Sequence, residues 1–309
     1  MGVVDDVQIL APREVPLGGP RAMTVRRTLP SRARSLVGGW CFLDHYGPDD
    51  VAATGGMAVP RHPHTALATV SWLFTGEIEH RDSTGAHAMV RPGELNLMTA
   101  GRGVSHSEFS TPDTSVLHGV QLWFALPSDA VDTEPTFDHH VPEPAYVPGG
   151  IARVFLGELF GERSPVVTHG ALTGAELLLD ADAETVVEVP AGHEHAVLLD
   201  DGDLSIDGTA LERGELGYVG TGRERFTLTS RTGARLVLVG GEPLGEQIVM
   251  WWNFVGRSHE DVVAARDRWM AEIGEQPPEG EERFGPFPEG QPAPLPAPAL
   301  PGGRLRARG

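Results

Sequence analysis

Two pairs of side chains with metal-ligand chemistry stand close together in the first third of the chain. His62 and His64 are two residues apart in RHPH, and His106 and Glu108 are two residues apart in SHSE. Residues i and i+2 of a β-strand point to the same face. If the two strands face each other inside a barrel, three imidazoles and one carboxylate converge on one point.

This donor set suits an octahedral ion and leaves two of its positions open. Imidazole and carboxylate ligands with open positions are typical of Fe(II) sites that use O₂, and Mn, Ni, Cu and Co also accept such ligands. Adjacent open positions admit a substrate and O₂ together. The pattern therefore indicates a site for one Fe(II) ion, although chance pairing of these residues stays open from spacing alone.

The other histidines are less informative because they stand alone. The chain has 13 His, and a single His is more often a surface group or a hydrogen-bonded core group than a ligand. We give this interpretation to His45, His80, His87, His118, His139, His140, His169 and His259.

Bulk composition narrows the class of protein. A chain of 309 residues with 40% hydrophobic residues can form two cores. The formal net charge of −19 repels phosphates, so direct binding to nucleic acid is not expected. Cys41 is the single cysteine, which excludes an internal disulfide and fits a reducing compartment. Since we find neither a signal sequence nor an apolar run of about 18 residues, we expect a cytoplasmic protein without a membrane partner.

Short strands between turn signals fill most of residues 20–245. Examples are 67–74 (LATVSWLF) and 116–126 (VLHGVQLWFAL), and the sequence EIEHRD-STG-AHAMVRPGEL predicts a hairpin. The Pro- and Gly-rich segment 134–150 is typical of a connector, and a second set of strands follows it. The chain is therefore predicted to be all-β.

A weak internal repeat divides the strands into two similar units. HPH precedes GELNLMTAGRGVSH in the first half, and HEH precedes GELGYVGTGRER in the second. When the two glycine-containing turns are aligned, Arg225 falls opposite His106. A guanidinium has no lone pair to donate and repels a cation. The second unit is therefore predicted to bind no metal, and His193 and His195 to be a remnant of a site.

One helix is predicted near the C-terminal end of the chain. Ser258 can cap it, Asp261 in the first turn favours the N-terminal dipole, and Gly274 ends it. Its apolar stripe consists of Val262, Val263, Trp269, Met270 and Ile273.

Several stretches carry a more specific resemblance. GGMAVPRHPH has the spacing of the first cupin motif, and GRGVSH has the Gly–x–Gly–x–x–His of the second. Together with WCFLDHYGP, GEIEHRDSTG, RPGELNLMTAGRGVSHSE and HGVQLW, they make the chain resemble the pirin family of bicupins over roughly residues 8–250. The resemblance implies two tandem cupin (jelly-roll) β-barrels with a short C-terminal α-helix. It also implies one iron per chain in the N-terminal barrel, held by His62, His64, His106 and Glu108.

The expected organisation has four parts. Residues 1–135 form the N-terminal metal-binding cupin barrel, and residues 136–249 form a C-terminal cupin barrel without metal. Residues 250–275 contain an aromatic segment and the helix, which pack on the barrels. The Pro-rich residues 276–309 are expected to be disordered.

The chain departs from the family pattern directly after HPH. The family commonly continues with a segment such as RGFET, whereas this chain has TALAT. Thr65 and Ala68 replace a charged Arg and Glu that would lie near the mouth of the pocket. The substrate preference of better-known members is therefore not carried over.

The resemblance implies a first candidate function, that of an enzyme. Pirin-like proteins include flavonol (quercetin) 2,4-dioxygenases. By this analogy Glu108 is the catalytic residue and accepts the proton of a flavonol hydroxyl, and O₂ then cleaves the ring with release of CO. Asp44 and His45 are expected to orient a ligand imidazole. The partners are a small aromatic substrate, such as a flavonol, and O₂.

The resemblance also implies an alternative without turnover. Pirin-like proteins include redox-sensing regulators that bind a transcription factor or a metabolic enzyme. Exchange between Fe(II) and Fe(III) would alter the local charge and a surface for a protein partner. A metal-bound bicupin with neither activity is the third possibility.

Overall fold

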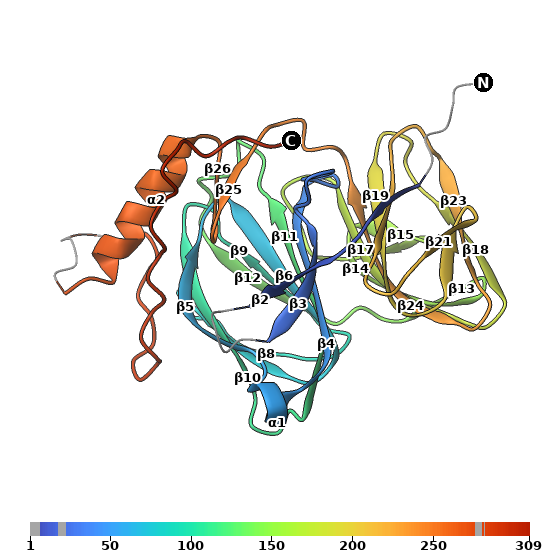
Figure 1. Ribbon diagram of the computed structural model, residues 1–309, viewed down its shortest axis with the longest axis horizontal. Helices are drawn as coiled ribbons and strands as arrows, with labels where there is room; N and C mark the ends of the chain where they lie inside the picture. The colour runs from blue at the N-terminus through green and yellow to red at the C-terminus, as the bar shows by residue number, and fades with distance from the viewer. Residues whose placement is uncertain (1–6, 18–22, 276–279, 281) are drawn as a thin grey trace.

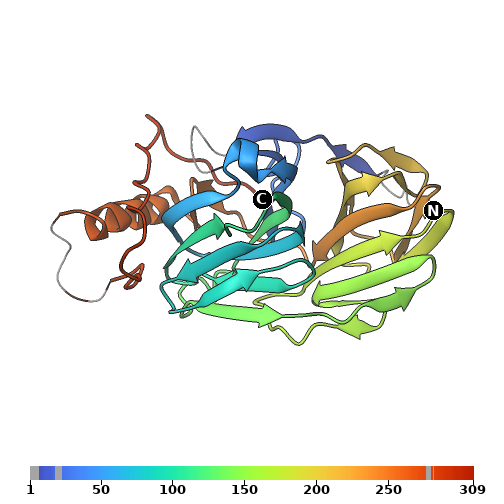
Figure 2. The same ribbon diagram turned by 90° about the horizontal axis from the view of Figure 1, so that it is seen from below.

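The computed structural model describes residues 7–17, 23–275, 280 and 282–309. Two β-barrels lie side by side, and the helix α2 (His259–Glu272) packs beside the first barrel, away from the second (Figure 1). Figure 2 shows the same arrangement from below. Each barrel combines a seven-stranded and a four-stranded sheet. The expected all-β fold of two tandem barrels with a short C-terminal helix is confirmed.

The first barrel contains eleven strands and the short helix α1 (Val51–Thr54). Its seven-stranded sheet has the order β12 (Thr136–His140), β9 (Leu95–Thr99), β6 (Leu67–Thr75), β11 (Val116–Ala125), β4 (Trp40–Asp50), β3 (Thr24–Leu29) and β2 (Arg13–Pro16). Its four-stranded sheet has the order β5 (Ala58–His64), β10 (Val104–Ser110), β7 (Ile78–Asp82) and β8 (His87–Val90).

The second barrel repeats this plan. Its seven-stranded sheet has the order β1 (Gln8–Leu10), β22 (Leu216–Val219), β19 (Glu194–Gly202), β24 (Ala234–Gly241), β17 (Leu172–Leu179), β14 (Gly150–Leu156) and β13 (Ala145–Val147). The four-stranded sheet is β18 (Ala183–Glu188), β23 (Arg225–Ser230), β20 (Leu204–Ile206) and β21 (Thr209–Leu211). Two small hairpins form sheets of their own, separate from the sheets of both barrels. They are β15 (Glu158–Leu159) with β16 (Glu162–Arg163), and β25 (Val249–Trp251) with β26 (Phe254–Gly256).

The strands cross the expected boundary between residues 135 and 136 in both directions. The N-terminal strand β1 pairs with β22 of the second barrel, and β12 pairs with β9 of the first. Each barrel therefore includes a strand from the part of the chain assigned to the other, because pairing depends on which sheet edge a strand reaches and not on its place in the sequence.

The two seven-stranded sheets pack face to face around one apolar core. Ala68, Val70 and Trp72 of β6 belong to this core together with Phe155 of β14. The alternate residue Ser71 points into the first barrel, where its hydroxyl reaches Glu108. Both faces of the central strands are thus buried, which explains why 67–74 is nearly continuously apolar.

The helix α2 begins and ends close to the predicted positions. Ser258 is its N-cap and forms a capping box with Asp261, and Ile273 is its C-cap. Val262 and Trp269 of the predicted stripe are buried in a cluster with Val249 and Phe254 of the β25–β26 hairpin and with Phe284. No helix within the described ranges is long and apolar enough to cross a membrane.

The segment from Glu282 onward, for which composition predicted disorder, lies against the first barrel. Phe284 is fully buried, with its ring 5.4 Å from that of Trp269. Ser105 donates a hydrogen bond to the Phe284 carbonyl, and Arg61 donates one to the Gly285 carbonyl. An aromatic anchor and backbone acceptors order this Pro-rich chain. Residues 276–279 and 281 of the expected tail lie outside the described residues.

We predict that Phe155→Ala destabilises the protein by about 3–5 kcal/mol, because it leaves a cavity in the core between the barrels. The Phe155 ring is buried and stacks on Trp72, with 4.6 Å between the ring centroids. Denaturant unfolding measures the change. Val167→Ala is the control, since Val167 is 88% exposed and its replacement is expected to change stability by less than about 0.5 kcal/mol. Equal effects of the two substitutions would contradict a shared core.

Candidate metal centre

The four expected ligands lie on neighbouring strands of one sheet. The strands β5 and β10 pair antiparallel, with His106 opposite His62 and Val104 opposite His64. The two strands are therefore neighbours in one sheet and do not face each other across the barrel. Alternate residues of adjacent strands point to the same side of their sheet, and the potential ligand atoms of His62, His64 and His106 lie within 4.8 Å of one another. All four side chains are buried.

A tight turn brings β10 into this position. Gly101 has φ +49°, and a Cβ atom there would lie 2.0 Å from the Thr133 carbonyl oxygen. A larger residue could not adopt this close approach. A register shift in the pairing of β5 with β10 follows between His106 and Glu108, and such bulges re-aim side chains.

Two of the three imidazoles have a defined donor nitrogen. His62 Nδ1 lies 2.9 Å from the Pro60 carbonyl oxygen, and His64 Nδ1 lies 3.0 Å from that of Asn253. A carbonyl only accepts hydrogen bonds, so both Nδ1 atoms carry the proton. In the neutral rings the Nε2 atoms keep their lone pairs, as metal ligands must.

Glu108 is held by a chain of polar groups inside the barrel. The Ser71 hydroxyl lies 3.1 Å from Glu108 Oε1 and 3.0 Å from Gln121 Oε1. The potential ligand atoms form two overlapping triads, His62–His64–His106 and His80–His106–Glu108. His106 belongs to both and joins the imidazole pair on β5 to the carboxylate.

Burial controls the protonation of this cluster. It lowers the pKa of His62 to about 4, and with the neighbouring imidazoles it lowers the pKa of His64 and of His106 well below the ordinary value. Burial also raises the pKa of Glu108, although His80 and the Ser71 hydroxyl oppose this effect. The three expected imidazole ligands are therefore neutral near pH 7, which is the form that binds a metal.

Sequence reasoning missed His80 as a member of this cluster. His80 lies on β7 opposite Glu108, and His80 Nδ1 is 3.5 Å from His106 Nδ1. Phe137 stacks on its ring. The available signal was the hairpin sequence EHRDS, which places His80 and Asp82 two residues apart on a strand.

Asp44 and His45 do not contact the expected ligands, so their predicted role was wrong. Asp44 accepts two hydrogen bonds from Arg27, at 2.6 and 2.8 Å. His45 Nε2 lies 2.7 Å from Asp200 Oδ1, which also lies 2.6 Å from His118 Nε2. These two residues thus serve strand pairing and the contact between the barrels.

The cluster of His45, His118 and Asp200 is a third set of three potential ligands. Burial would raise the pKa of Asp200, but hydrogen bonds from the two imidazoles outweigh it and hold that pKa well below its usual range. The Arg26 Nε donates to His45 Nδ1 at 3.3 Å, and Arg235 lies 3.5 Å from Asp200. This positive surrounding opposes a cation, so the cluster is suited to joining the barrels.

Thr65 and Ala68, which depart from the family pattern, do not lie at an open pocket mouth. Thr65 is 3% exposed and donates to the Val255 carbonyl, and Ala68 lies in the core between the barrels. The expectation that they line an entrance was wrong, because Thr65 is covered by the β25–β26 hairpin and Ala68 by the second barrel.

The second barrel places its histidine pair differently. His195 is the second residue of β19 and is buried, and His193 precedes that strand with its ring 6.2 Å away. Arg225 is exposed and lies opposite Glu188 in the pairing of β18 with β23. Within the described part of the chain, neither His193 nor His195 belongs to a group of three potential ligands.

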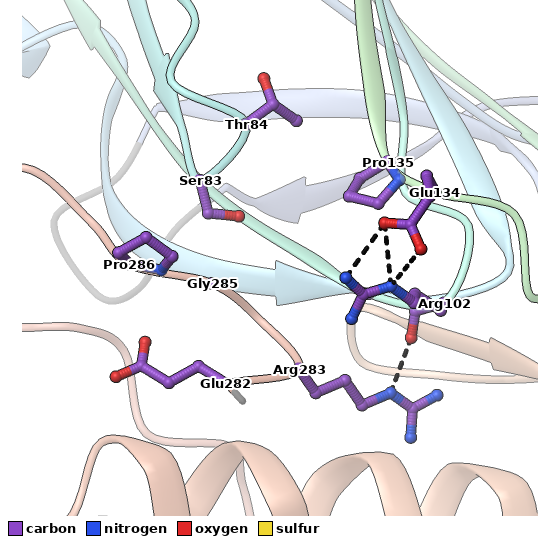
Figure 3. Close-up of a pocket in the computed structure, with 10 residues that line it drawn as sticks. Ser83, Thr84, Arg102, Glu134, Pro135, Glu282, Arg283, Gly285 and Pro286 are labelled. Carbon is purple, nitrogen blue, oxygen red and sulfur yellow. Dashed lines mark hydrogen bonds and ion pairs between the residues drawn. The ribbon is translucent and has the colours of Figure 1, made fainter. Parts of the chain in front are cut away.

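A surface pocket of about 370 Å³ lies outside the first barrel, beside the C-terminal segment. Figure 3 shows Ser83 and Thr84 on one side of it and Arg283 on the other, with Arg102 paired to Glu134 between them. None of its lining residues is an expected ligand. It marks the place where the C-terminal segment covers the turns that precede β8 and β10.

Two jelly-roll barrels in tandem, with a buried cluster of histidines and one glutamate in the first, define a bicupin. A family model described as pirin matches residues 22–124, and one described as the pirin C-terminal cupin domain matches residues 174–272. The chain belongs to the pirin family.

Individual relatives agree with this assignment. The chain is 39% identical to a Pseudomonas aeruginosa protein named "Putative quercetin 2,3-dioxygenase PA1205", over 96% of this chain and 91% of that protein. It is 35% identical to a pirin-like protein of Caulobacter vibrioides, over 86% and 94% of the two chains. A crystal structure of quercetin 2,3-dioxygenase from Acinetobacter baumannii superposes with a TM-score of 0.89 at 34% identity and covers 97% of both chains.

The buried His195 predicts a loss of stability in acid. Burial, with a smaller effect of His193, lowers the pKa of His195 to about 4. Between pH 6.5 and 4 the unfolded chain takes up a proton there and the folded chain does not, so this contribution to stability is complete above pH 6.5 and falls as the pH drops to 4. The shift corresponds to a few kcal/mol. His195→Leu is expected to give a shallower decline in denaturant midpoint between pH 7 and 4.

His169→Leu serves as the matched control, because His169 is exposed. It is expected to leave the pH dependence of the wild type unchanged. A His195→Leu variant with the same pH slope as the wild type would show that His195 is protonated in the folded protein over this range.

Proposed function

We propose that this protein is a metal-dependent dioxygenase that acts on a flavonol at the N-terminal barrel. One Fe(II) ion per chain is held by His62, His64, His106 and Glu108, and Mn, Ni, Cu or Co can replace it. The observation that supports the proposal is a group of three buried imidazoles, His62, His64 and His106, with the buried Glu108 carboxylate in a second group that shares His106. The names of the relatives support quercetin as a substrate of this class, with positions 2,3 where the sequence resemblance suggested 2,4.

The spacing of the donors fits an ion. His64 Nε2 and His106 Nε2 lie 3.0 Å apart. Two nitrogens bound about 2.1 Å from one ion at a right angle would have a separation of about 3.0 Å. The donor hydrogen bonds of His62 and His64 to carbonyl groups leave their lone pairs for such an ion.

A bound ion would supply a Lewis acid with open positions for a substrate oxygen and for O₂. The protein itself supplies the proton acceptor. Glu108 can take the proton of a flavonol hydroxyl, since burial raises the pKa of its carboxyl group, which favours the protonated form after transfer. The Ser71 hydroxyl orients one carboxylate oxygen.

Aromatic side chains pack beside the cluster. The Trp123 ring lies 5.0 Å from the His64 ring and stacks on Phe42 at 3.9 Å, and both aromatic side chains are buried. Edge and stacked contacts of this kind hold the His64 ring in place. The proposal includes the cytoplasmic location expected from the sequence. The free, buried thiol of Cys41 fits the reducing compartment that this location implies.

Metal content tests the site directly. We predict about one transition metal per wild-type chain, loss of that metal in His106→Ala, and its retention in Arg225→Ala, because His106 belongs to both groups of potential ligands in the first barrel whereas Arg225 is exposed on the second. Mass spectrometry of the purified proteins measures this. Two metals per chain would contradict the assignment of a single site, and no metal after loading with Fe(II) would remove both the enzyme and the redox regulator.

Turnover tests the activity. We predict that the Fe(II)-loaded protein consumes O₂ in the presence of quercetin, and that Glu108→Gln at equal metal content lowers kcat by about 10²- to 10⁴-fold, since a positioned base contributes this much. An oxygen electrode and CO detection measure the reaction. Tight metal binding without O₂ consumption, while a flavonol-cleaving control enzyme is active, would reject the dioxygenase and favour the redox-sensing regulator.

A further inference from the structure

The hairpin sequence EHRDS supplies two buried polar groups beside the metal centre that the proposed function does not use. His80 is 3% exposed and Asp82 is fully buried. Both lie on β7, which pairs with β10 on the side opposite β5, so that Asp82 stands across from His106 and His80 across from Glu108. They therefore flank the ligand strand from its other edge.

The three imidazoles of the centre differ in what holds their second nitrogen. His62 and His64 donate to main-chain carbonyls, which accept only. The corresponding nitrogen of His106 lies 3.5 Å from His80 Nδ1, an atom that can either donate or accept. The tautomer of His106 thus depends on the state of a side chain.

Asp82 determines that state. His80 Nε2 lies 3.0 Å from Asp82 Oδ2, and a carboxylate accepts, so this nitrogen carries the proton. In the neutral ring His80 Nδ1 then has a lone pair and accepts from His106 Nδ1. His106 Nε2 is left without a proton and free to bind an ion.

We propose that His80 and Asp82 are positioning residues, which set the tautomer of His106 and so hold its Nε2 lone pair toward the metal. This inference rests on the proposed metal site and adds a chain of hydrogen bonds from Asp82 through His80 to His106. Such groups behind a ligand commonly change metal affinity by about 10- to 100-fold.

The chain is rigid because the Asp82 carboxylate is anchored at its other oxygen. Asp82 Oδ1 accepts from the Thr84 main-chain nitrogen at 2.8 Å, from the Thr84 hydroxyl at 2.5 Å and from the Ala86 nitrogen at 3.2 Å. Phe137 stacks on the His80 ring, with 4.8 Å between the ring centroids. The turn is also tied to β10, since Ser83 and Ser105 exchange hydrogen bonds.

This anchoring makes Asp82→Asn a sharp test. Three donors face Oδ1, so the amide oxygen of the variant stays there and its NH₂ group faces His80 Nε2. His80 must then accept at Nε2 and carry its proton on Nδ1, which meets the proton on His106 Nδ1. The clash is relieved when His106 moves its proton to Nε2, the atom that should bind the metal.

The experiment measures Co(II) affinity of the metal-free full-length protein by competition with a chelator. Asp82→Asn and His80→Phe are expected to bind Co(II) about 10- to 100-fold more weakly than the wild type. Asp203→Asn is the matched control, because Asp203 caps a turn of the second barrel through Thr232 and Arg231 without contacting a histidine. Its Co(II) affinity is expected to equal that of the wild type.

A second measurement separates tautomer control from general loosening. In the metal-free protein with ¹⁵N-labelled histidine, His106 Nε2 is expected to have the chemical shift of an unprotonated nitrogen in the wild type and that of a protonated nitrogen in Asp82→Asn. The Nε2 signals of His62 and His64 should stay those of unprotonated nitrogens in both proteins. Equal Co(II) affinity in Asp82→Asn and wild type, or an unchanged His106 signal, would overturn the inference.

The outcomes distinguish this inference from the proposed activity. A wild-type protein that binds Co(II) and shows the expected loss in Asp82→Asn supports the positioning role, even if quercetin is not consumed. A wild-type protein that binds no Co(II) overturns the metal site and the positioning role together. Weakened binding in Asp203→Asn as well would assign the effect to lost charge and reject tautomer control.

Discussion

The face-to-face packing of the two seven-stranded sheets constrains both faces of their central strands. One face must be apolar because it meets the other barrel, as Val70 and Trp72 do on β6. The other face lines the barrel interior and is free to carry polar groups, as Ser71 does beside Glu108. The hydrophobic contact between the barrels therefore stabilises the fold. The interior of the first barrel can then hold polar side chains in place of a purely apolar core.

Within that interior, the candidate metal centre depends on strand register. The strand β10 lies between β5 and β7, so that His106 has His62 on one side and Asp82 on the other. A slip of one residue would turn every ligand to the opposite face of the sheet. The turn at Gly101, whose backbone approaches Thr133 too closely for a side chain, is one feature that holds this register.

Histidine serves two different purposes in this fold. In the first barrel His62, His64 and His106 are buried and neutral, as metal ligands must be. Between the barrels His45 and His118 share one oxygen of Asp200 and join the two sheets. The neighbouring groups decide the purpose, since carbonyl acceptors and a carboxylate surround the first set, whereas Arg26, Arg213 and Arg235 lie around the second.

The sequence by itself determined the all-β class, the division into two similar β-units, the capped helix α2 and the two pairs of candidate ligands, because periodicity, capping and i, i+2 spacing are local properties. The barrels and the joint set of four ligands were implied by the resemblance to the pirin family. Only the tertiary structure decided which strands are neighbours. His80 lies beside the candidate metal centre because β7 pairs with β10. The N-terminal strand β1 pairs with β22 of the second barrel. Phe284 orders a Pro-rich segment by packing on Trp269. These contacts join residues far apart in the chain, and their stability comes from burial and pairing that no local pattern encodes.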